Sequence, residues 1–285
     1  MAVADKRHKY EYQVALDADS GPARVVRMVG ENKRVLEIGC GPGSITKLLA
    51  GKSNCKVTAL DIDAESIEKI QDYCEHAYQA DLNDPAWTQI LGERTKFDVL
   101  VAADVLEHVY GPATVLSGMK TLLADDGYMV ISLPHAGHSV IHACLFDEDF
   151  EYNDSGLLDR THIRFFGIKN MQTLFEDAGM KIVDAEFVVR EPEHTEFSKR
   201  WRRTPQELRD ALAKNPFGLV YQVIVKVVTV TSGEKALSLI DMATQPQSPS
   251  VGNSIKAFLR LHLSTGLYSR LQRLDELRHS FFCKK

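Results

Sequence analysis

The stretch Val35–Ala50, VLEIGCGPGSITKLLA, decides the fold of this protein, because it has the pattern of a strand, a tight turn and a helix start. VLEI is an apolar run typical of a buried strand, and glycines follow it at positions 39, 41 and 43. Ser44 to Leu49 then has a helical pattern. Backbone N–H groups at such a helix start usually cradle a nucleotide cofactor, so the stretch predicts a cofactor site.

Outward from this stretch, short apolar strands alternate with helical segments. Strands of near-continuous apolar residues predict a parallel sheet that helices cover on both faces. The fold class is therefore α/β, a doubly wound and mostly parallel sheet. The other expected strands are Val57–Leu60, Ala77–Gln79, Phe97–Ala102, Gly127–Leu133, Lys181–Val189 and Leu219–Thr229.

The composition indicates an ordinary globular protein, with 44% hydrophobic and 26% charged residues among 285. The net charge of −5 argues against a protein that binds nucleic acid through bulk positive charge. No apolar run reaches the roughly 18 residues of a membrane-spanning helix. The start, MAVADKRHKYEY, has no apolar core of the signal-peptide kind, and the five cysteines form no C-x-x-C pair. These features predict a cytoplasmic protein.

Acidic residues indicate which cofactor the turn holds. Glu37 ends the first strand, where its carboxylate would repel a pyrophosphate but suits an ammonium or sulfonium group. Ser44 stands where a dinucleotide-binding turn has its last glycine. Asp61 follows the glycines by about twenty residues and can accept ribose hydroxyls, which fits NAD equally well, while Asp81 can meet an adenine amino group. S-adenosylmethionine carries both cationic groups and no phosphate, so it is the expected cofactor.

At this point the chain resembles the class I S-adenosylmethionine-dependent methyltransferases. The matching pieces are VLEIGCGPG, LDID, QADLND and FDVLVAADVLEHV, and the resemblance covers residues 34–230. It implies a seven-stranded sheet whose last strand is antiparallel and lies beside the sixth. It also implies the cofactor contacts: Glu37, Gly39, Gly41 and Gly43 at the methionine part, Asp61 and Ile62 at the ribose and adenine, Asp81 and Leu82 at the adenine, and Ala103 closing the pocket.

A second segment, GLLDRTHIRFFGIKNMQTLFEDAGM, bears on the methyl acceptor. It resembles a segment of methyltransferases of surface-glycan and modified-sugar biosynthesis, in which an L-D-R-T-H-x-R-F-F run follows a strand that ends in proline. Here that run spans residues 158–166, and the strand ends at Pro134. His135 stands where such relatives often have asparagine, which is a departure from the pattern. The resemblance implies a sugar or glycan-precursor acceptor.

A sugar hydroxyl is too weakly acidic to ionise at neutral pH, so O-methylation needs a base at the pocket mouth. His162 is the first candidate, and His135 and His138 are the next. His108 also follows a strand, but its segment has the pattern of a packed helix. A purely structural role for His162, as part of a loop pinned by hydrogen bonds, remains open.

The same loop carries two arginines. Arg160 and Arg164 either bind a phosphate of the substrate or pair with Asp154 or Asp159. The spacing of His135, His138 and His142 could place three imidazoles on one helix face with a carboxylate such as Asp147 or Asp159, but a polar cluster explains the spacing equally well. No metal ligands are therefore assigned from the sequence.

The expected domains are a methyltransferase domain over residues 1–231, a linker over 232–253 and an amphipathic helical tail over 254–285. The domain includes a lid or substrate wall at about 135–167 and a helical insertion at about 192–216. From residue 251 onward, seven Lys/Arg against two acidic residues make +5, which leaves −10 for the rest of the chain. Packing on the domain or on a second subunit is the preferred role of the tail, and contact with an anionic membrane surface is the alternative.

Taken together, the sequence predicts an enzyme that moves the methyl group of S-adenosylmethionine to an oxygen of a sugar or glycan precursor, with a histidine base. N-methylation of an amino sugar and O-methylation of another small metabolite are the alternatives within the fold. A cofactor-binding module without catalysis and a nicotinamide-dependent oxidoreductase are the alternatives outside it.

Overall fold

A computed structural model describes residues 10–92 and 95–243 of the chain. The predicted tail at 254–285 and the end of the predicted linker therefore lie outside the described residues. The helices are α1 Gly21–Val29, α2 Thr46–Gly51, α3 Ala64–Ile70, α4 Pro112–Leu122, α5 Ser139–Phe146, α6 Ile168–Asp177, α7 Ser198–Arg203 and α8 Gln206–Leu212. The strands are β1 Arg34–Ile38, β2 Lys56–Asp61, β3 His76–Gln79, β4 Phe97–Ala103, β5 Leu123–Pro134, β6 Met180–Val189 and β7 Val220–Thr229.

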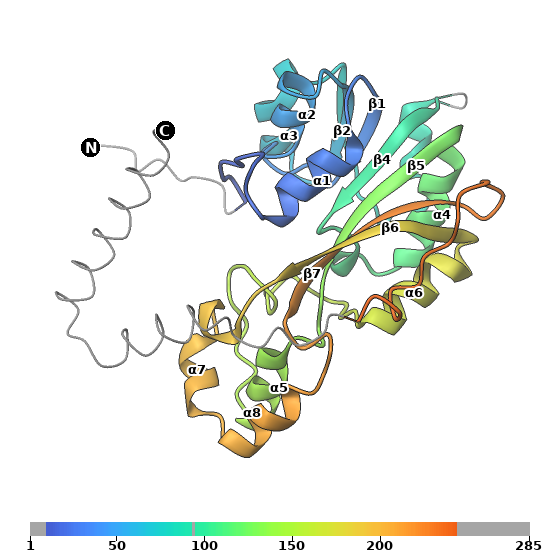
Figure 1. The fold of residues 1–285 in the computed structure, drawn as a ribbon. Coiled ribbons are helices and arrows are strands. Elements are labelled where there is room, and N and C mark those ends of the chain that lie inside the picture. Colours follow the sequence, from blue (N-terminus) through green and yellow to red (C-terminus); the bar gives the residue numbers. More distant parts are fainter. Residues whose placement is uncertain (1–9, 93–94, 244–285) are drawn as a thin grey trace, which may run out of the picture. The chain divides into compact units, whose positions relative to one another are not determined.

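The strands form one seven-stranded sheet in the order β3-β2-β1-β4-β5-β7-β6 (Figure 1). The pairs from β3 to β5 are all parallel, whereas β7 is antiparallel to both β5 and β6. The last strand is thus inserted beside the sixth, as the resemblance to methyltransferases implies, and the predicted fold class is confirmed. The order reverses at β1, so the carboxyl ends of β1 and β4 open a crevice between them.

Two apolar layers cover the two faces of the sheet. On one face, the apolar sides of α1, α2 and α3 pack on side chains such as Val35, Val57 and Val99. On the other face, α4 and α6 pack on Leu36 and Leu100, the alternate residues of the same strands. Because successive side chains of a strand point to opposite faces, a doubly covered strand must be apolar throughout. This is why VLEI and FDVLVA are nearly continuous apolar runs.

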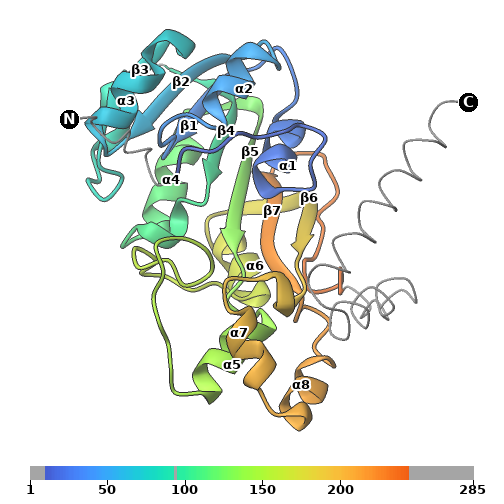
Figure 2. The same ribbon diagram turned by 90° about the vertical axis from the view of Figure 1, so that its left-hand side faces the viewer.

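A smaller helical layer lies at one end of the sheet, where Figures 1 and 2 both place α5, α7 and α8. It has its own apolar cluster, in which Val140 and Cys144 of α5 contact Leu158 and Phe197. The predicted wall at 135–167 contains a helix, since SVIHACLF forms α5, in which Val140, Ile141, Ala143 and Cys144 are buried while Leu145 and Phe146 are exposed. The helices α7 and α8 lie within the expected insertion at 192–216.

The segment after β7 differs from the predicted linker. Leu239 is fully buried in the main core, and its backbone N–H donates to the side chain of Gln172 at 2.9 Å. The N–H of Leu237 donates to the carbonyl of Ile182 at 2.7 Å. Residues 237–242 thus belong to the domain, because their apolar side chains complete the core beside α6 and β6.

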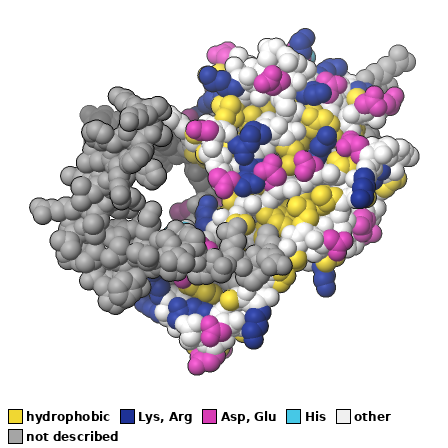
Figure 3. Space-filling view, viewed as in Figure 1, with side chains coloured by type: hydrophobic (Ala, Val, Ile, Leu, Met, Phe, Trp, Pro, Cys, Tyr) yellow, Lys and Arg dark blue, Asp and Glu magenta, His cyan; other side chains and the backbone are white. Residues whose placement is uncertain are grey.

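The outer surface carries mixed charge. On the face shown in Figure 3, basic and acidic side chains are interspersed among apolar ones. Within residues 10–92 and 95–243, no helix has the length and apolar character needed to cross a membrane.

Candidate active site

A cavity of about 880 Å³ lies at the carboxyl ends of the parallel strands. Parallel strands that end at one edge bring their following loops together, so residues distant in sequence share this cavity. Every predicted cofactor residue except Gly43 lines it: Glu37, Gly39, Gly41, Asp61, Ile62, Asp81, Leu82 and Ala103.

Two of the three glycines of the turn, Gly41 and Gly43, have different roles. Gly41 has φ +51° and lines the cavity, and a Cβ added there would meet no atom within 4 Å. That open space allows a ligand to approach the backbone closely. Gly43 has φ +85°, but a Cβ there would lie 2.3 Å from Cγ2 of Ile70 in α3. Gly43 therefore permits close packing of the loop on α3 and does not line the cavity.

Glu37 is buried at the end of β1, with 2% of its surface exposed. The hydroxyl of Thr46 donates to its Oε2 at 2.7 Å. Burial, with the neighbouring Asp61 carboxylate adding to it, raises the pKa of Glu37 from its ordinary 4.5 to about 8. A buried carboxyl in this state is suited to a cationic ligand group, which would favour its ionised form.

Asp61 holds two backbone segments that line the cavity, at Gly41 and at Asp63. Its Oδ2 accepts from the N–H of Gly41 at 2.7 Å, and its Oδ1 accepts from the N–H of Asp63 at 2.9 Å. Each carboxylate oxygen has a second lone pair, so the side chain can still accept from ribose hydroxyls. Asp81 in turn accepts from the backbone and side-chain amides of Asn83.

The cavity lining is strongly acidic. Among the described lining residues, seven are acidic and Arg190 is the one arginine or lysine. Asp104 and Gln222 were not predicted from the sequence. Asp104 follows β4 with φ +54°, and Gln222 from β7 donates to both of its carboxylate oxygens at 2.6 and 2.7 Å. An acidic lining favours cationic and hydroxyl-bearing ligands over anionic ones.

An N-terminal segment crosses the glycine turn. The N–H of Tyr12 donates to the hydroxyl of Ser44, and that hydroxyl donates to the carbonyl of Tyr10, both at 3.2 Å. The Tyr10 hydroxyl donates to Asp159 at 3.3 Å. Tyr10, Tyr12 and Tyr221 all line the cavity. The sequence offered no signal for these tyrosines, since they reach the cavity only through tertiary contacts.

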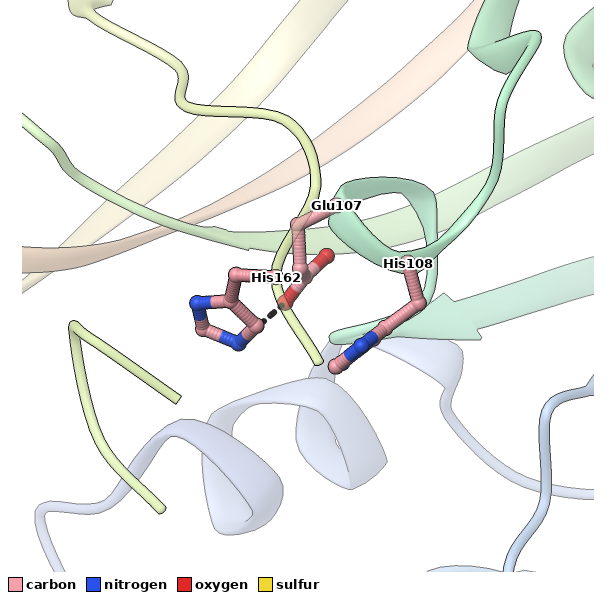
Figure 4. A group of neighbouring side chains, drawn as sticks. All are labelled: Glu107, His108 and His162. Atoms are coloured by element: carbon pink, nitrogen blue, oxygen red, sulfur yellow. Dashed lines mark ion pairs between the residues drawn. The ribbon is translucent and has the colours of Figure 1, made fainter. Parts of the chain in front are cut away.

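His162 lines the same cavity and lies beside Glu107 and His108 (Figure 4). Backbone pairing sets this neighbourhood, because the N–H groups of Ile163 and Arg164 donate to the carbonyl of Glu107 at 2.9 and 3.1 Å. Nδ1 of His162 lies 3.2 Å from the carbonyl oxygen of Leu157. A carbonyl only accepts, so Nδ1 carries the hydrogen and Nε2 keeps the lone pair.

Glu107 is the residue of this group that the sequence missed. It is fully buried and lines the cavity, yet neither carboxylate oxygen has a hydrogen-bond partner among the described residues. Its Oε1 lies 3.9 Å from Nε2 of His162. Burial first, and then the charge of Asp104, raise the pKa of Glu107 well above 4.5. The available signal was the position of Glu107 four residues after the end of the fourth strand, next to His108.

The other two candidate bases have structural roles. Nε2 of His138 donates to the carbonyl of Arg190 at 2.8 Å, and its Nδ1 accepts from the N–H of Val140 at the start of α5. With both nitrogens engaged, His138 has no lone pair for a proton or a metal. His135 donates from Nδ1 to Val220 and faces a separate, smaller cavity beside Lys169. We therefore do not retain either as a base, nor the three-histidine metal site.

The two arginines of the loop are not among the residues that line the cavity. Arg160 pairs with Asp154 at 2.7 Å, and 60% of its side chain is exposed. Arg164 donates to the carbonyl of Tyr110 at 2.6 Å. Neither lines the cavity, so of the two predicted roles, the structure supports the pairing of Arg160 and not phosphate binding.

Fold and cavity together define the class. A seven-stranded sheet with this order and an acid-lined cleft at the turn after β1 is the arrangement expected of a class I methyltransferase. The family model described as "Methyltransferase domain" matches residues 8–185. The chain belongs to this methyltransferase family, whose cofactor is S-adenosylmethionine.

Curated relatives share a part of the chain. A ubiquinone biosynthesis O-methyltransferase of Actinobacillus pleuropneumoniae is 30% identical over 106 residues, which are 35% of this chain and 45% of that protein. One of Xylella fastidiosa is 33% identical over 101 residues, 35% of this chain and 41% of that protein. The chain thus spans less than half the length of these relatives. Their names do not support the expected glycan acceptor.

Solved structures share the fold at low identity. A methyltransferase from Archaeoglobus fulgidus, described as S-adenosylmethionine-dependent, superposes with a TM-score of 0.50 at 18% identity and covers 72% of this chain and 92% of its own. A [4+2]-cyclase has the same TM-score at 13% identity, covering 80% and 86%. Because the fold hosts different reactions, the acceptor must be argued from the site.

Proposed function

We propose that this protein transfers the methyl group of S-adenosylmethionine to a hydroxyl oxygen of a sugar or glycan precursor. The observation that carries the proposal is the single cavity in which the cofactor residues and His162 meet. Bound cofactor would supply an electrophilic methyl group on a sulfonium. The residues of the chain then have two tasks: to orient the acceptor oxygen toward that methyl and to receive its proton.

His162 is the group best suited to the second task. Its Nδ1 donates to the carbonyl of Leu157, and this hydrogen bond fixes the orientation of the ring and leaves the lone pair on Nε2. Burial lowers the pKa of His162, and the neighbouring His108 adds to this effect. A lowered pKa keeps the imidazole neutral near pH 7, the form that accepts a proton.

The lining supports a neutral polyhydroxy acceptor. Carboxylates such as Asp104 accept hydrogen bonds from hydroxyl groups, and the ring of Tyr12 offers an apolar face for a sugar ring. The acidic excess disfavours an acceptor whose phosphate enters the cavity. The same excess is compatible with an amino sugar, in which case the methyl would go to nitrogen.

The names of the curated relatives favour a second candidate, O-methylation of a ubiquinone precursor. This candidate uses the same proton acceptor and the same cofactor residues, and it differs in the acceptor ring that would contact Tyr12. A panel of acceptors separates the two candidates: neutral sugars, nucleotide sugars, amino sugars and hydroxylated quinone precursors.

The experiment measures release of S-adenosylhomocysteine by the purified full chain with each acceptor class. We expect turnover with a hydroxylated sugar, and about a 10²-fold or greater loss of kcat in His162→Gln with cofactor affinity retained. Glutamine keeps a hydrogen bond to Leu157 but takes no proton. Full activity of His162→Gln would assign proton removal elsewhere, and turnover only with quinone precursors would exclude the sugar acceptor.

A further inference from the structure

The Glu107 carboxyl is the strongest unexplained feature of the cavity. Its side chain has no exposed surface, and both oxygens lack a hydrogen-bond partner among the described residues. An unpaired buried carboxylate is costly, and native proteins relieve that cost with a hydrogen bond, a cation, a metal or uptake of a proton. Protonation alone would still leave the Glu107 carboxyl without a hydrogen-bond partner among the described residues. Arg190, the one arginine or lysine among the described lining residues, stacks on the ring of Tyr221 instead.

Two imidazoles face the same point, and each is oriented through its other nitrogen. Nδ1 of His108 lies 3.0 Å from the carbonyl oxygen of Thr161, and Nδ1 of His162 lies 3.2 Å from that of Leu157. Both histidines therefore carry hydrogen on Nδ1 and present a lone pair on Nε2. A histidine that binds a metal almost always has its second nitrogen fixed in this way by a carbonyl or carboxylate.

One ligand atom each from Glu107, His108 and His162 lies within 4.8 Å of the other two. Figure 4 shows the three side chains as neighbours. Around an ion with bonds of about 2.0–2.2 Å, ligand atoms stand roughly 3.0–3.5 Å apart. Closing the group on an ion thus requires shifts of about 1 Å, which side-chain rotation can provide. The acidic residues Asp104 and Asp159 line the same cavity and favour a cation there.

We propose that Glu107, His108 and His162 bind one divalent transition-metal ion. Two imidazole nitrogens and one carboxylate suit ions such as Mn²⁺, Fe²⁺ or Zn²⁺, whereas Ca²⁺ and Mg²⁺ prefer oxygen ligands alone. The three ligands leave coordination positions open toward the cavity, as in catalytic sites. Sequence spacing does not point to this group, because His162 is more than fifty residues from Glu107 in the chain.

The role of this ion, though not its binding, rests on the proposed function. Without the ion, His162 takes the acceptor proton itself. With the ion, the acceptor hydroxyl would gain acidity next to a divalent cation, and its proton would leave to water. The oxygen then bonds to the methyl carbon while the carbon–sulfur bond breaks and its electron pair stays on sulfur. His162 becomes a ligand in this form, and the transfer should be faster than in the metal-free protein.

Mn²⁺ tests the site directly, because its electron paramagnetic resonance signal separates free from bound ion. The full chain is freed of metal with a chelator, desalted and titrated with Mn²⁺ alone. We expect one ion per chain, and at least a tenfold weaker affinity in Glu107→Gln and in His162→Gln. His142→Gln is the matched control, since His142 lies outside the cavity lining and should leave the affinity unchanged.

Binding of S-adenosylhomocysteine to each variant shows that it is folded, and His108→Asn serves as a third ligand variant if one of the others does not fold. Absence of Mn²⁺ binding up to millimolar concentration, or binding that the three ligand variants do not weaken, overturns the proposal. If methyl transfer resists the chelator and no Mn²⁺ binds, the metal site is wrong and the proposed function stands. If Mn²⁺ binds but no hydroxyl acceptor is methylated, the metal site stands and the proposed function is wrong.

Discussion

At the scale of the residue, burial decides the chemistry of the cofactor end. Glu37 would be an ordinary carboxylate in water, but at the end of β1 it is almost fully enclosed and has Thr46 as its hydrogen-bond donor. It lines the same cavity as the glycine turn and interacts with the charge of Asp61, which makes it a suitable partner for a cationic ligand group. The strength of that partnership must depend on pH, because the carboxyl has to lose a proton before it can bind a cation.

The first prediction concerns this dependence. The Glu37 carboxyl ionises near pH 4.5 in the unfolded chain but near pH 8 in the folded protein. Between these values the folded state binds more protons, so Glu37 lowers the free energy of unfolding as pH rises, by about 1.4 kcal/mol per pH unit. Affinity for S-adenosylhomocysteine, which has an ammonium group, should rise about tenfold per pH unit up to about pH 8.

Calorimetric titration from about pH 6 to about pH 8 measures this slope. In Glu37→Gln the slope should vanish, affinity should be lower throughout, and the ligand-free protein should be more stable at neutral pH. A wild-type affinity that does not change over this range would contradict the assignment of Glu37 to the cationic part of the cofactor.

The second prediction concerns Asp61. Asp61→Ala removes the acceptor of the Gly41 N–H and the expected acceptor of the ribose hydroxyls. Loss of such hydrogen bonds costs roughly 1–3 kcal/mol, so the Kd for S-adenosylmethionine should rise by about one to two factors of ten. Asp84→Ala is the control, because Asp84 only accepts from a local turn N–H and does not line the cavity. Equal affinities in the two variants would place the ribose elsewhere.

At the scale of the element, the turn between β1 and α2 must both leave space for a ligand and pack on α3. The glycine pattern of the sequence does not show which glycine serves which purpose. Gly41 and Gly43 stand two residues apart, and both have positive φ. Only the neighbours distinguish them, because Gly41 borders open cavity and Gly43 touches Ile70 of α3.

The third prediction uses this difference. Gly43→Ala should lower the melting temperature strongly, because its methyl group would overlap Ile70, at a cost of about 1–3 kcal/mol beyond the backbone strain. Gly41→Ala should cost mainly the strain, about 1 kcal/mol, while weakening cofactor binding. Thermal unfolding and calorimetry of both variants test the pair. Equal melting temperatures would show that α3 does not pack on the loop as described.

The fourth prediction concerns His138, which joins α5 to the end of β6. Burial lowers its pKa from 6.5 to about 4. Between these values the unfolded chain binds the proton and the folded protein does not, so stability falls as pH falls from about 6.5 to about 4. The loss is on the order of 2–4 kcal/mol. In His138→Gln this part of the acid sensitivity should disappear, as urea unfolding at several pH values would reveal.

The same variant checks that His138 is structural. His138→Gln should retain kcat at neutral pH, because His138 does not line the cavity. A large loss of kcat with normal stability would return His138 to the list of candidate bases.

At the scale of the whole molecule, positive net charge lies in the last part of the chain and negative net charge in the remainder. The last 35 residues carry +5 and the remainder carries −10, while the cavity lining is acidic. The cavity is lined by described residues between Tyr10 and Gln222. Cofactor binding should therefore not need the basic segment at the end of the chain.

The fifth prediction concerns a chain that ends at Ala243. It should bind S-adenosylhomocysteine as the full chain does. Its melting temperature should be lower, since the sequence predicts an apolar helix face at Leu267, Leu271 and Leu274 that packs on the domain or on a second subunit. Differential scanning calorimetry and light scattering measure both effects. An unchanged melting temperature and oligomeric state, with loss of binding to anionic vesicles only, would favour the membrane surface instead.

The strands, the glycine turn and most cofactor residues of this protein could be predicted from local sequence. The run VLEI, the three glycines, Glu37 and Asp61 predict the first βαβ unit and its cofactor, because apolar periodicity and tight turns are properties of neighbouring residues. The seven strands and the antiparallel position of β7 follow from the same signals together with the resemblance to methyltransferases. Eight of the nine predicted cofactor residues line the cavity for this reason.

The histidine part of the cavity depended on tertiary structure. Among three candidate histidines, only His162 faces the cavity, because backbone pairing to Glu107 positions its loop while carbonyl groups engage His135 and His138. The isolation of the Glu107 carboxyl, and the helix at 139–146, likewise arise from packing between distant segments. Sequence spacing determines what neighbours along the chain can do, but burial and the direction of a lone pair are set only when remote segments meet.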